Sequence, residues 1–218
     1  MAVASHWRCK CGDECYEDQY DLDGDCDTDI VDIMAVASRW GCRCGDDCYY
    51  GTGALAISQV ERRLLMVPAE VRVAPSSSMV ASSETFAMTV EIEDAVDLGG
   101  FQLALTFDPA VIQADDVTLG DFLGGTGRSV SALGPEIDNA AGRATFGGFS
   151  FGDRAGASGD GTLATITLRA QGSSSTQLEL DDVQLVDTRG QPLEVTAEGA
   201  AIVGGSFLQT YLPLVTVP

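Results

Sequence analysis

The sequence predicts a mainly β protein, a two-sheet β-sandwich preceded by a small helical module that is rich in cysteine. After residue 68, short runs of alternating apolar and polar residues are separated by Gly, Ser, Asp and Asn, and no long helical period follows. Before residue 50, an acidic loop runs into an apolar stretch with helical spacing. All seven cysteines lie in that same region.

The composition excludes several classes of partner. The chain has 33 acidic and 12 basic side chains in 218 residues, and its formal net charge is -21. Such a surface repels phosphate backbones and anionic lipid headgroups, so we expect no nucleic-acid or membrane-surface partner, and bound cations are the natural counter-charge. The apolar tail at residues 205–218 is too short to span a bilayer.

The cysteines indicate an oxidising compartment. They fall at Cys9, Cys11, Cys15, Cys26, Cys42, Cys44 and Cys48. This density in a short acidic module favours a disulfide framework, and hence an extracellular or cell-surface protein. Zinc is the alternative, because the spacing C-x-C-x3-C occurs twice and His6 is nearby, but structural zinc sites usually use C-x2-4-C pairs.

A repeat of 33 residues organises the N-terminal region. Residues 1–17 align with residues 34–50, and 12 of the 17 positions are identical. The second copy follows the acidic loop, whereas the first copy begins where its helix should already be under way. We therefore expect an N-terminally truncated chain, with a further loop, an eighth cysteine and the signal peptide upstream.

The acidic loop has the spacing of an oxygen-ligated calcium site. Such loops place side-chain ligands at positions 1, 3, 5 and 12 and a backbone carbonyl at position 7. With position 1 at Asp21, the predicted metal ligands are Asp21, Asp23, Asp25, Asp27 and Asp32, with Asp29 at the water-mediated position 9. Cys26 stands at position 6, where glycine is usual, and an aspartate replaces glutamate at position 12. An acidic solvated linker is the alternative.

The apolar run at residues 30–40 follows this loop directly, so a helix follows the loop but none precedes it. This pattern resembles a dockerin, a small calcium-binding module of loop-helix repeats, and the predicted module spans residues 1–50. In dockerins, loop positions 10 and 11 help to select the partner. The resemblance therefore implies partner-binding roles for Ile30 and Val31, although both could equally pack against the Cys-rich segment.

The predicted strands of the larger domain follow in order. Residues 86–92 and 101–107 each present one apolar face, and turn residues separate the later runs. These later runs are residues 143–151, 162–170, 176–186 and 193–203. Residues 51–68 show no clear period and are predicted to be a connector.

The order of motifs in residues 69–204 resembles a cohesin domain, the jelly-roll β-sandwich that receives dockerins. The motifs are the sequences GGFQLALTFDP, GDFLGG, RATFGGFSFG, GDGTLATITLRA and LELDDVQLVDTRG. The resemblance implies that the strand at residues 100–107 lies in the partner-facing sheet. Its outward residues would be Gly100, Gln102, Ala104 and Thr106, and residues 143–150 should lie on the same face. An ordinary solvated sheet face is the alternative.

Two interpretations of the sequence as an enzyme have little support. Residues 148–152 fit the pattern G-x-S-x-G, but that motif needs a strand-turn-helix context and a histidine partner, and His6 is the only histidine. Glu136 and Asp138 could imitate a glycosidase pair, yet chance pairs are common in so acidic a chain.

The combined expectation is a non-catalytic extracellular scaffold or adaptor that uses calcium as its cofactor. Its partners would be dockerin- or cohesin-bearing proteins, including polysaccharide-degrading enzymes. A structural adhesion protein with a spacer sandwich and a carbohydrate-binding module are the alternatives. Whether the two modules of this chain pair with each other stays open at this point.

Overall fold

The computed structural model describes residues 2–43 and 67–204. Most of the predicted connector, the whole C-terminal tail, Cys44 and Cys48 lie outside the described residues. We call residues 2–43 the N-terminal segment and residues 67–204 the sandwich.

The sandwich is built from strands, as the alternating pattern predicts, and the expectation of a mainly β sandwich is confirmed. Its elements are β1 (Ala69–Ala74), β2 (Ser77–Val80), β3 (Thr85–Thr106), β4 (Ile112–Leu119), the 3-10 helix η2 (Phe122–Gly124), β5 (Ser129–Asp138), β6 (Arg143–Phe151), β7 (Ala157–Ala170), β8 (Thr176–Asp187), β9 (Pro192–Leu193), β10 (Val195–Glu198) and β11 (Ala200–Gly204).

The long strand β3 connects the two sheets. Along its first half it pairs with β1 and β7, and along its second half it pairs with β6 and β8. The ladder with β7 shifts register near residues 91–98, where Asp94 and Asp97 take positive φ angles of 55° and 54°. These irregularities bend one strand from one sheet into the other. The sequence pattern predicts two separate strands here, and that prediction is wrong because the bend interrupts the alternation without ending the strand.

Side chains from both sheets form one apolar core. Phe101, Leu103 and Leu105 of β3 point into it, together with Phe146 of β6 and Ile166 of β7, and each is at most 1% exposed. Because side chains alternate along a strand, the residues between them point away from the core. The second half of β3 therefore presents residues 100, 102, 104 and 106 on the outside.

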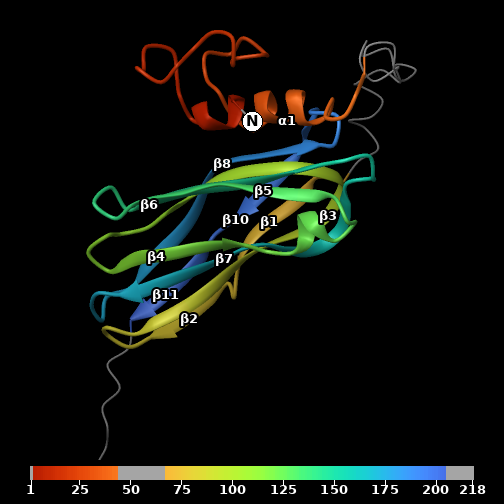
Figure 1. Ribbon diagram of the computed structural model, residues 1–218. Helices are drawn as coiled ribbons and strands as arrows, with labels where there is room; N and C mark the ends of the chain where they lie inside the picture. The colour runs from red at the N-terminus through yellow and green to blue at the C-terminus, as the bar shows by residue number, and fades with distance from the viewer. Residues whose placement is uncertain (1, 44–66, 205–218) are drawn as a thin grey trace, which may run out of the picture.

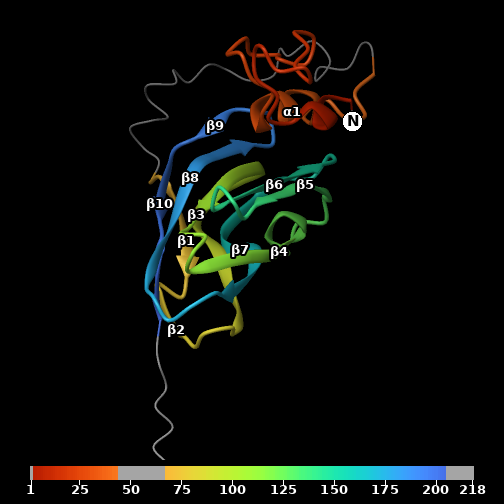
Figure 2. The ribbon, with the colours of Figure 1, turned by 90° about the vertical axis from the view of Figure 1, so that its left-hand side faces the viewer.

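The N-terminal segment lies against one side of the sandwich, next to β5, β6 and β8, and both views agree on this placement (Figure 1, Figure 2). It contains the 3-10 helix η1 (Val3–His6) and the helix α1 (Ile30–Ala37). The apolar spacing predicts a helix to Trp40, but α1 ends three residues earlier. We call the surface of β5, β6, β8 and the second half of β3 that faces the segment the outer face.

Candidate functional site

The predicted partner-facing residues of β3 lie beneath the N-terminal segment. Gly100 and Ala104 are buried, Gln102 is 9% exposed, and Thr106 at the end of the strand is partly exposed. The structure brings Ile30 onto this group of residues, while Val31 lies beside it and is partly buried. The outer face is therefore a covered surface in the described part of the chain.

Gln102 makes the central polar contact of the outer face. Its side-chain Oε1 accepts a hydrogen bond from Trp7 Nε1 at 2.8 Å and another from the backbone N–H of Ile30 at 3.0 Å. Ile30 is the first residue of α1, and the first N–H groups of a helix have no partner inside the helix. The sheet thus supplies the acceptor that this end of α1 lacks.

Glycines allow the segment to approach the sheet closely. A Cβ placed on Gly100 would lie 2.9 Å from Ile30 Cδ1, and one placed on Gly134 would lie 3.1 Å from the Trp7 ring. Gly190 meets the backbone of α1 in the same way, because a Cβ there would lie 3.2 Å from the Ala35 nitrogen. Side chains at these positions would occupy the space that the segment fills.

A second apolar cluster joins the segment to the outer face. Ile30, Ile33 and Met34 of α1 are fully buried in it. Leu133 of β5, Phe149 of β6 and Val186 of β8 contribute from the sheet side, and Val3, Trp7 and Ala37 complete it from the segment. Such burial stabilises an association by about 25 cal/mol for each Å² of apolar surface removed from water.

Polar and aromatic contacts surround this cluster. Arg8 forms an ion pair with Glu136 at the β5 side. Trp40 packs against Phe151 of β6 with ring centroids 5.5 Å apart. At the β8 side, the Asp29 carboxylate interacts with the Gln184 side chain, and burial raises the pKa of Asp29 to about 6.

Asp29 and Asp32 cap the start of α1. The Asp29 side chain accepts from the Val31 N–H at 2.7 Å, and Asp32 accepts from the Asp29 N–H at 2.9 Å, so the two form a capping box. Asp32 also accepts from the Leu22 N–H at 2.5 Å, which ties the acidic loop to the helix. Burial raises the pKa of Asp32.

Asp21 organises the acidic loop. Its carboxylate accepts from the backbone N–H groups of Gly24, Asp25 and Cys26, and from the Tyr16 hydroxyl at 2.7 Å. The hydrogen bond from Tyr16 lowers the pKa of Asp21 and raises that of Tyr16 to about 12. The loop is therefore a turn whose backbone N–H groups converge on the Asp21 carboxylate.

The predicted metal ligands fall into two overlapping groups. Carboxylate oxygens of Asp21, Asp23 and Asp25 lie within 4.8 Å of one another, and so do those of Asp25, Asp27 and Asp29. Asp32 belongs to neither group in the described residues, because its oxygens face the backbone of the loop and of α1.

These carboxylates fit a hard divalent cation. All of the gathered donors are oxygens, which calcium prefers. Burial and neighbouring carboxylates raise the pKa values of Asp23 and Asp27, and the Oδ1 of Asp27 is buried without a hydrogen-bond donor among the described residues. A cation would relieve the repulsion and supply the missing partner.

One disulfide holds this loop against the first repeat copy, and a second lies within that copy. Cys11 pairs with Cys26, and Cys9 pairs with Cys15. Cys26 has a φ of 77°, so it makes the left-handed bend at the position where calcium loops usually have glycine. Cys26 is thus paired with a cysteine of the first repeat copy, and the expectation of an eighth cysteine upstream stays a prediction.

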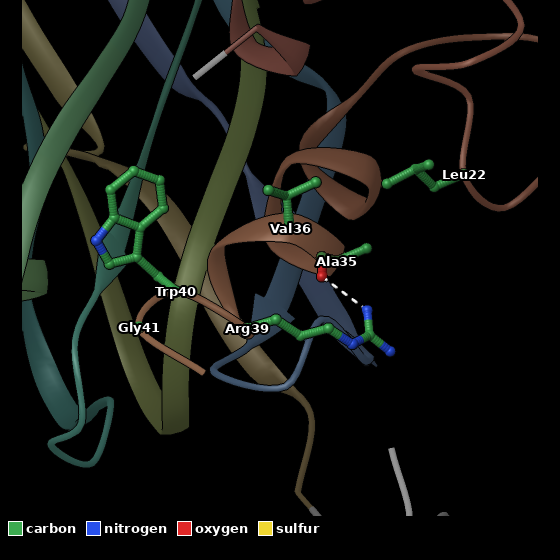
Figure 3. A pocket seen from close by; sticks show the side chains of 6 residues that line it. All are labelled: Leu22, Ala35, Val36, Arg39, Trp40 and Gly41. Atoms are coloured by element: carbon green, nitrogen blue, oxygen red, sulfur yellow. Dashed lines mark hydrogen bonds between the residues drawn. The ribbon is translucent and has the colours of Figure 1, made fainter. Parts of the chain in front are cut away.

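A shallow pocket lies on the N-terminal segment beside α1 (Figure 3). Its lining residues are Leu22, Ala35, Val36, Arg39, Trp40 and Gly41. Leu22 and Trp40 are 50% and 56% exposed, and the Arg39 side chain donates to the Ala35 carbonyl at 2.9 Å. The segment thus keeps an open apolar surface besides the one it buries.

The serine of the G-x-S-x-G match has a structural role. Ser150 is fully buried within β6, where its hydroxyl accepts from Arg128 Nε at 2.9 Å and donates to the Gly99 carbonyl at 3.1 Å. A nucleophile elbow exposes its serine on a strand-to-helix turn, which Ser150 does not.

The sequence pattern alone misses several contact residues of the site. Trp7 donates its ring N–H to Gln102, which is 95 residues away in the sequence, so no local pattern indicates this contact. Phe149 and Leu133 lie on strands whose in-out direction the sequence leaves uncertain or does not predict at all. The repeat gives one indication that Trp7 has a contact role, because Trp7 and Trp40 hold equivalent positions in the two copies.

A comparison with protein families matches the cohesin domain to residues 71–201. This range runs from β1 to β11 and includes every strand of the outer face. A comparison with curated proteins finds no significant match.

Solved cohesin structures share the fold. A non-cellulosomal cohesin from the archaeon Archaeoglobus fulgidus is 20% identical with a TM-score of 0.50, and the match covers 64% of this chain and 93% of that one. The third cohesin ScaC of Acetivibrio cellulolyticus, solved with the ScaB dockerin, is 12% identical with a TM-score of 0.52, covering 63% and 99%. The OlpA cohesin of Clostridium thermocellum, solved with dockerin Doc918, is 9% identical with a TM-score of 0.52, also covering 63% and 99%.

Proposed function

The chain belongs to the cohesin family, and from this premise we propose that it is a non-catalytic scaffold or adaptor protein that works by cohesin–dockerin type pairing. Cohesin domains are non-catalytic interaction modules that bind dockerin-bearing partners. One observation carries the proposal for this chain: the outer face already receives the end of a helix, through Gln102 and the space above Gly100.

The proposed mechanism is binding alone. An incoming helix places apolar side chains over Gly100 and against Phe149 and Val186, while its first N–H groups meet the Gln102 side chain. The sheet is already rigid, because strands on both sides of β3 hold it by hydrogen bonds. A preformed receptor loses little conformational entropy when a partner binds.

We further propose that the N-terminal segment is a dockerin-like module that takes calcium. Asp21, Asp23, Asp25 and Asp27 would hold the ion, and Asp29 would contact it from the second group of carboxylates. Calcium would supply positive charge that offsets their mutual repulsion. The loop then fixes the start of α1 through the Asp32 hydrogen bond to Leu22.

The proposed setting is extracellular or at the cell surface, in assemblies that include polysaccharide-degrading enzymes. The disulfides support the extracellular setting. Among the helices described in the structure, none is both long and apolar enough to span a membrane.

A titration of the purified full chain against a panel of dockerin modules tests the pairing. We expect at least one module to bind in calcium, and a chain carrying Phe149→Asp to lose that binding. Asp115→Asn, on the opposite sheet, is the control. If no module binds, and the chain is instead retained on insoluble polysaccharide, the receptor proposal is wrong and the carbohydrate-binding alternative takes its place.

Calorimetric titration with calcium tests the loop separately. We expect one bound ion and a higher unfolding temperature, and Asp23→Asn should weaken calcium binding at least tenfold because it removes a charged ligand. Asp18→Asn removes the same charge outside the loop and should leave affinity nearly unchanged. Equal affinities for the two variants would contradict the assignment.

A further inference from the structure

The two surfaces with predicted binding roles bury each other. Ile30, from the acidic-loop module, lies over Gly100, and its N–H uses the Gln102 oxygen. In this arrangement neither Gln102 nor Ile30 is available to another molecule, since they are 9% and 0% exposed.

The contact is specific in both its apolar and its polar parts. Ile30 packs over Gly100 and the Trp7 ring packs against Gly134, so a glycine of the sandwich makes room for each of these side chains. The buried donors Trp7 Nε1 and Ile30 N–H share an acceptor in Gln102, and Arg8 has Glu136 as its counter-charge. A chance contact between two acidic modules would not satisfy its buried donors in this way.

The connection between the parts permits both closure and release. Residues 44–66 join them, and a chain of 23 residues reaches at most about 80 Å when extended. A covalent link of this length keeps the segment near its face at an effective concentration on the order of millimolar. Any outside partner must compete against that concentration.

We propose that the N-terminal segment is a built-in occupant of the chain's own cohesin face, so that the protein is closed on itself and an outside partner must displace residues 2–43. The inference rests on the proposed function of the outer face. It adds a regulatory step, because the apparent affinity for an outside partner equals the intrinsic affinity multiplied by the fraction of chains that are open.

Cleavage of the link tests the closed state without any outside partner. A protease site is inserted between residues 55 and 56 of the full chain, and the cut protein is analysed by gel filtration with light scattering. We expect a single-chain mass before cleavage, and fragments that still elute together after it. Separation of the wild-type fragments, or a two-chain mass before cleavage, would overturn closure within one molecule.

Gly100→Val supplies the matched variant. The three atoms nearest to the added Cβ all belong to the segment, so the change should block docking while the sandwich stays folded. We expect its fragments to separate after cleavage. Gly172→Val adds the same side chain where nothing lies within 4 Å of the new Cβ, and its fragments should stay together. Identical behaviour of the two variants would contradict the proposed contact.

Binding of a dockerin module distinguishes this inference from the function it rests on. In the uncut chain, Ile30→Asp should release the segment and raise the affinity for the module at least tenfold over wild type. Equal affinities would overturn self-occupation while keeping the receptor function. If no module binds even the Ile30→Asp chain, the receptor function fails, and the cleavage result still decides closure.

Discussion

Among the residues of the outer face, we expect Gln102 to contribute most to docking of the N-terminal segment. Its side-chain oxygen accepts hydrogen bonds from two parts of that segment. Trp7 belongs to the first repeat copy, and Ile30 directly follows the acidic loop. A buried donor without an acceptor costs about 1–3 kcal/mol. Loss of this oxygen leaves two such donors.

Gln102→Met should therefore weaken docking by about 2 kcal/mol or more while keeping the side-chain volume. The measurement is the fluorescence of Trp7 in a Trp40→Phe background, where an undocked Trp7 should emit at longer wavelength. Gln177→Met, at an exposed position of β8, is the control. Unchanged Trp7 emission in Gln102→Met would show that the hydrogen bonds contribute little.

Asp29 should make docking sensitive to pH. Its pKa is about 6 in the folded chain because of burial, against about 4 when unfolded. The folded state then binds more protons between these values, so stability is greatest below about pH 4 and falls as the pH rises to about 6. Above that range the contribution is lost.

The comparison of wild type with Asp29→Asn isolates this effect, because asparagine is an equally good N-cap. In calcium-free buffer, the stability of wild type relative to the variant should fall by about 1 kcal/mol from pH 5 to pH 7. Denaturant unfolding at both pH values measures it. A difference that grows with pH would contradict the buried state of this carboxyl.

Ser150 should affect stability alone. Ser150→Ala removes an acceptor from the buried Arg128 side chain and should lower the unfolding free energy of the sandwich by about 1–3 kcal/mol. Ser129→Ala, at an exposed position of β5, should have almost no effect. Thermal unfolding distinguishes the two, and an unchanged stability in Ser150→Ala would show that Arg128 finds another acceptor.

Among the elements, the acidic loop depends on its crosslink. The Cys11–Cys26 bond closes a loop with a sequence separation of 15, and a crosslink of this size stabilises by about 3 kcal/mol in the chain-entropy model. It also holds Cys26 at a positive φ, which costs a non-glycine residue about 1 kcal/mol or more. The bond thus sets the shape of the proposed calcium loop.

The double variant Cys11→Ser, Cys26→Ser should undock the N-terminal segment at a lower temperature than wild type. It should also weaken calcium binding. The pair Cys9→Ser, Cys15→Ser, which closes a shorter loop away from the aspartates, should weaken calcium binding less. Trp7 fluorescence during heating and calcium titration provide the measurements. A larger loss of calcium affinity in the Cys9→Ser, Cys15→Ser variant would contradict the role of the Cys26 bend.

The strands show which elements are predictable from the sequence. β6 runs from Arg143 to Phe151, as its alternation predicts, and residues 162–170 and 176–186 fall within β7 and β8. The sequence pattern does not predict β4 and β5, because exposed acidic and serine residues on these outlying strands hide the alternation. The pattern predicts one strand-like run at residues 193–203, but the structure has the separate strands β9, β10 and β11 in this region.

The candidate site was predictable only in part. Alternation along β3 indicates that Gly100 and Gln102 share the outward side, and aspartate spacing gathers Asp21, Asp23 and Asp25. Which surface meets which is a tertiary property, so the contact of Trp7 with Gln102 has no local signal. The hydrogen bonds of Asp32 to the loop also depend on the folded backbone.

At the scale of the whole molecule, the chain has two apolar clusters that are built from different parts of the chain. The larger one consists only of sandwich residues, whereas the smaller one is shared between the segment and the outer face. The sandwich core therefore does not depend on docking. The segment, with one short α-helix, relies on the sheet for its burial.

Heating should separate these two clusters. Ile33→Ala should lower the unfolding free energy of the segment by about 2–5 kcal/mol and leave the unfolding temperature of the sandwich unchanged. Ile166→Ala, a matched change in the larger core, should lower the sandwich transition. Scanning calorimetry with Trp7 fluorescence distinguishes them, and a single transition that shifts equally in both variants would contradict independent cores.

Because β3 is hydrogen-bonded on both sides in each sheet, it gives the outer face a mechanical property. A pulling force on a partner docked over β3 would be shared by the strands that are hydrogen-bonded to it on both sides. We therefore expect the partner to separate from the sheet before any strand is pulled out, which leaves the sandwich folded and able to bind again.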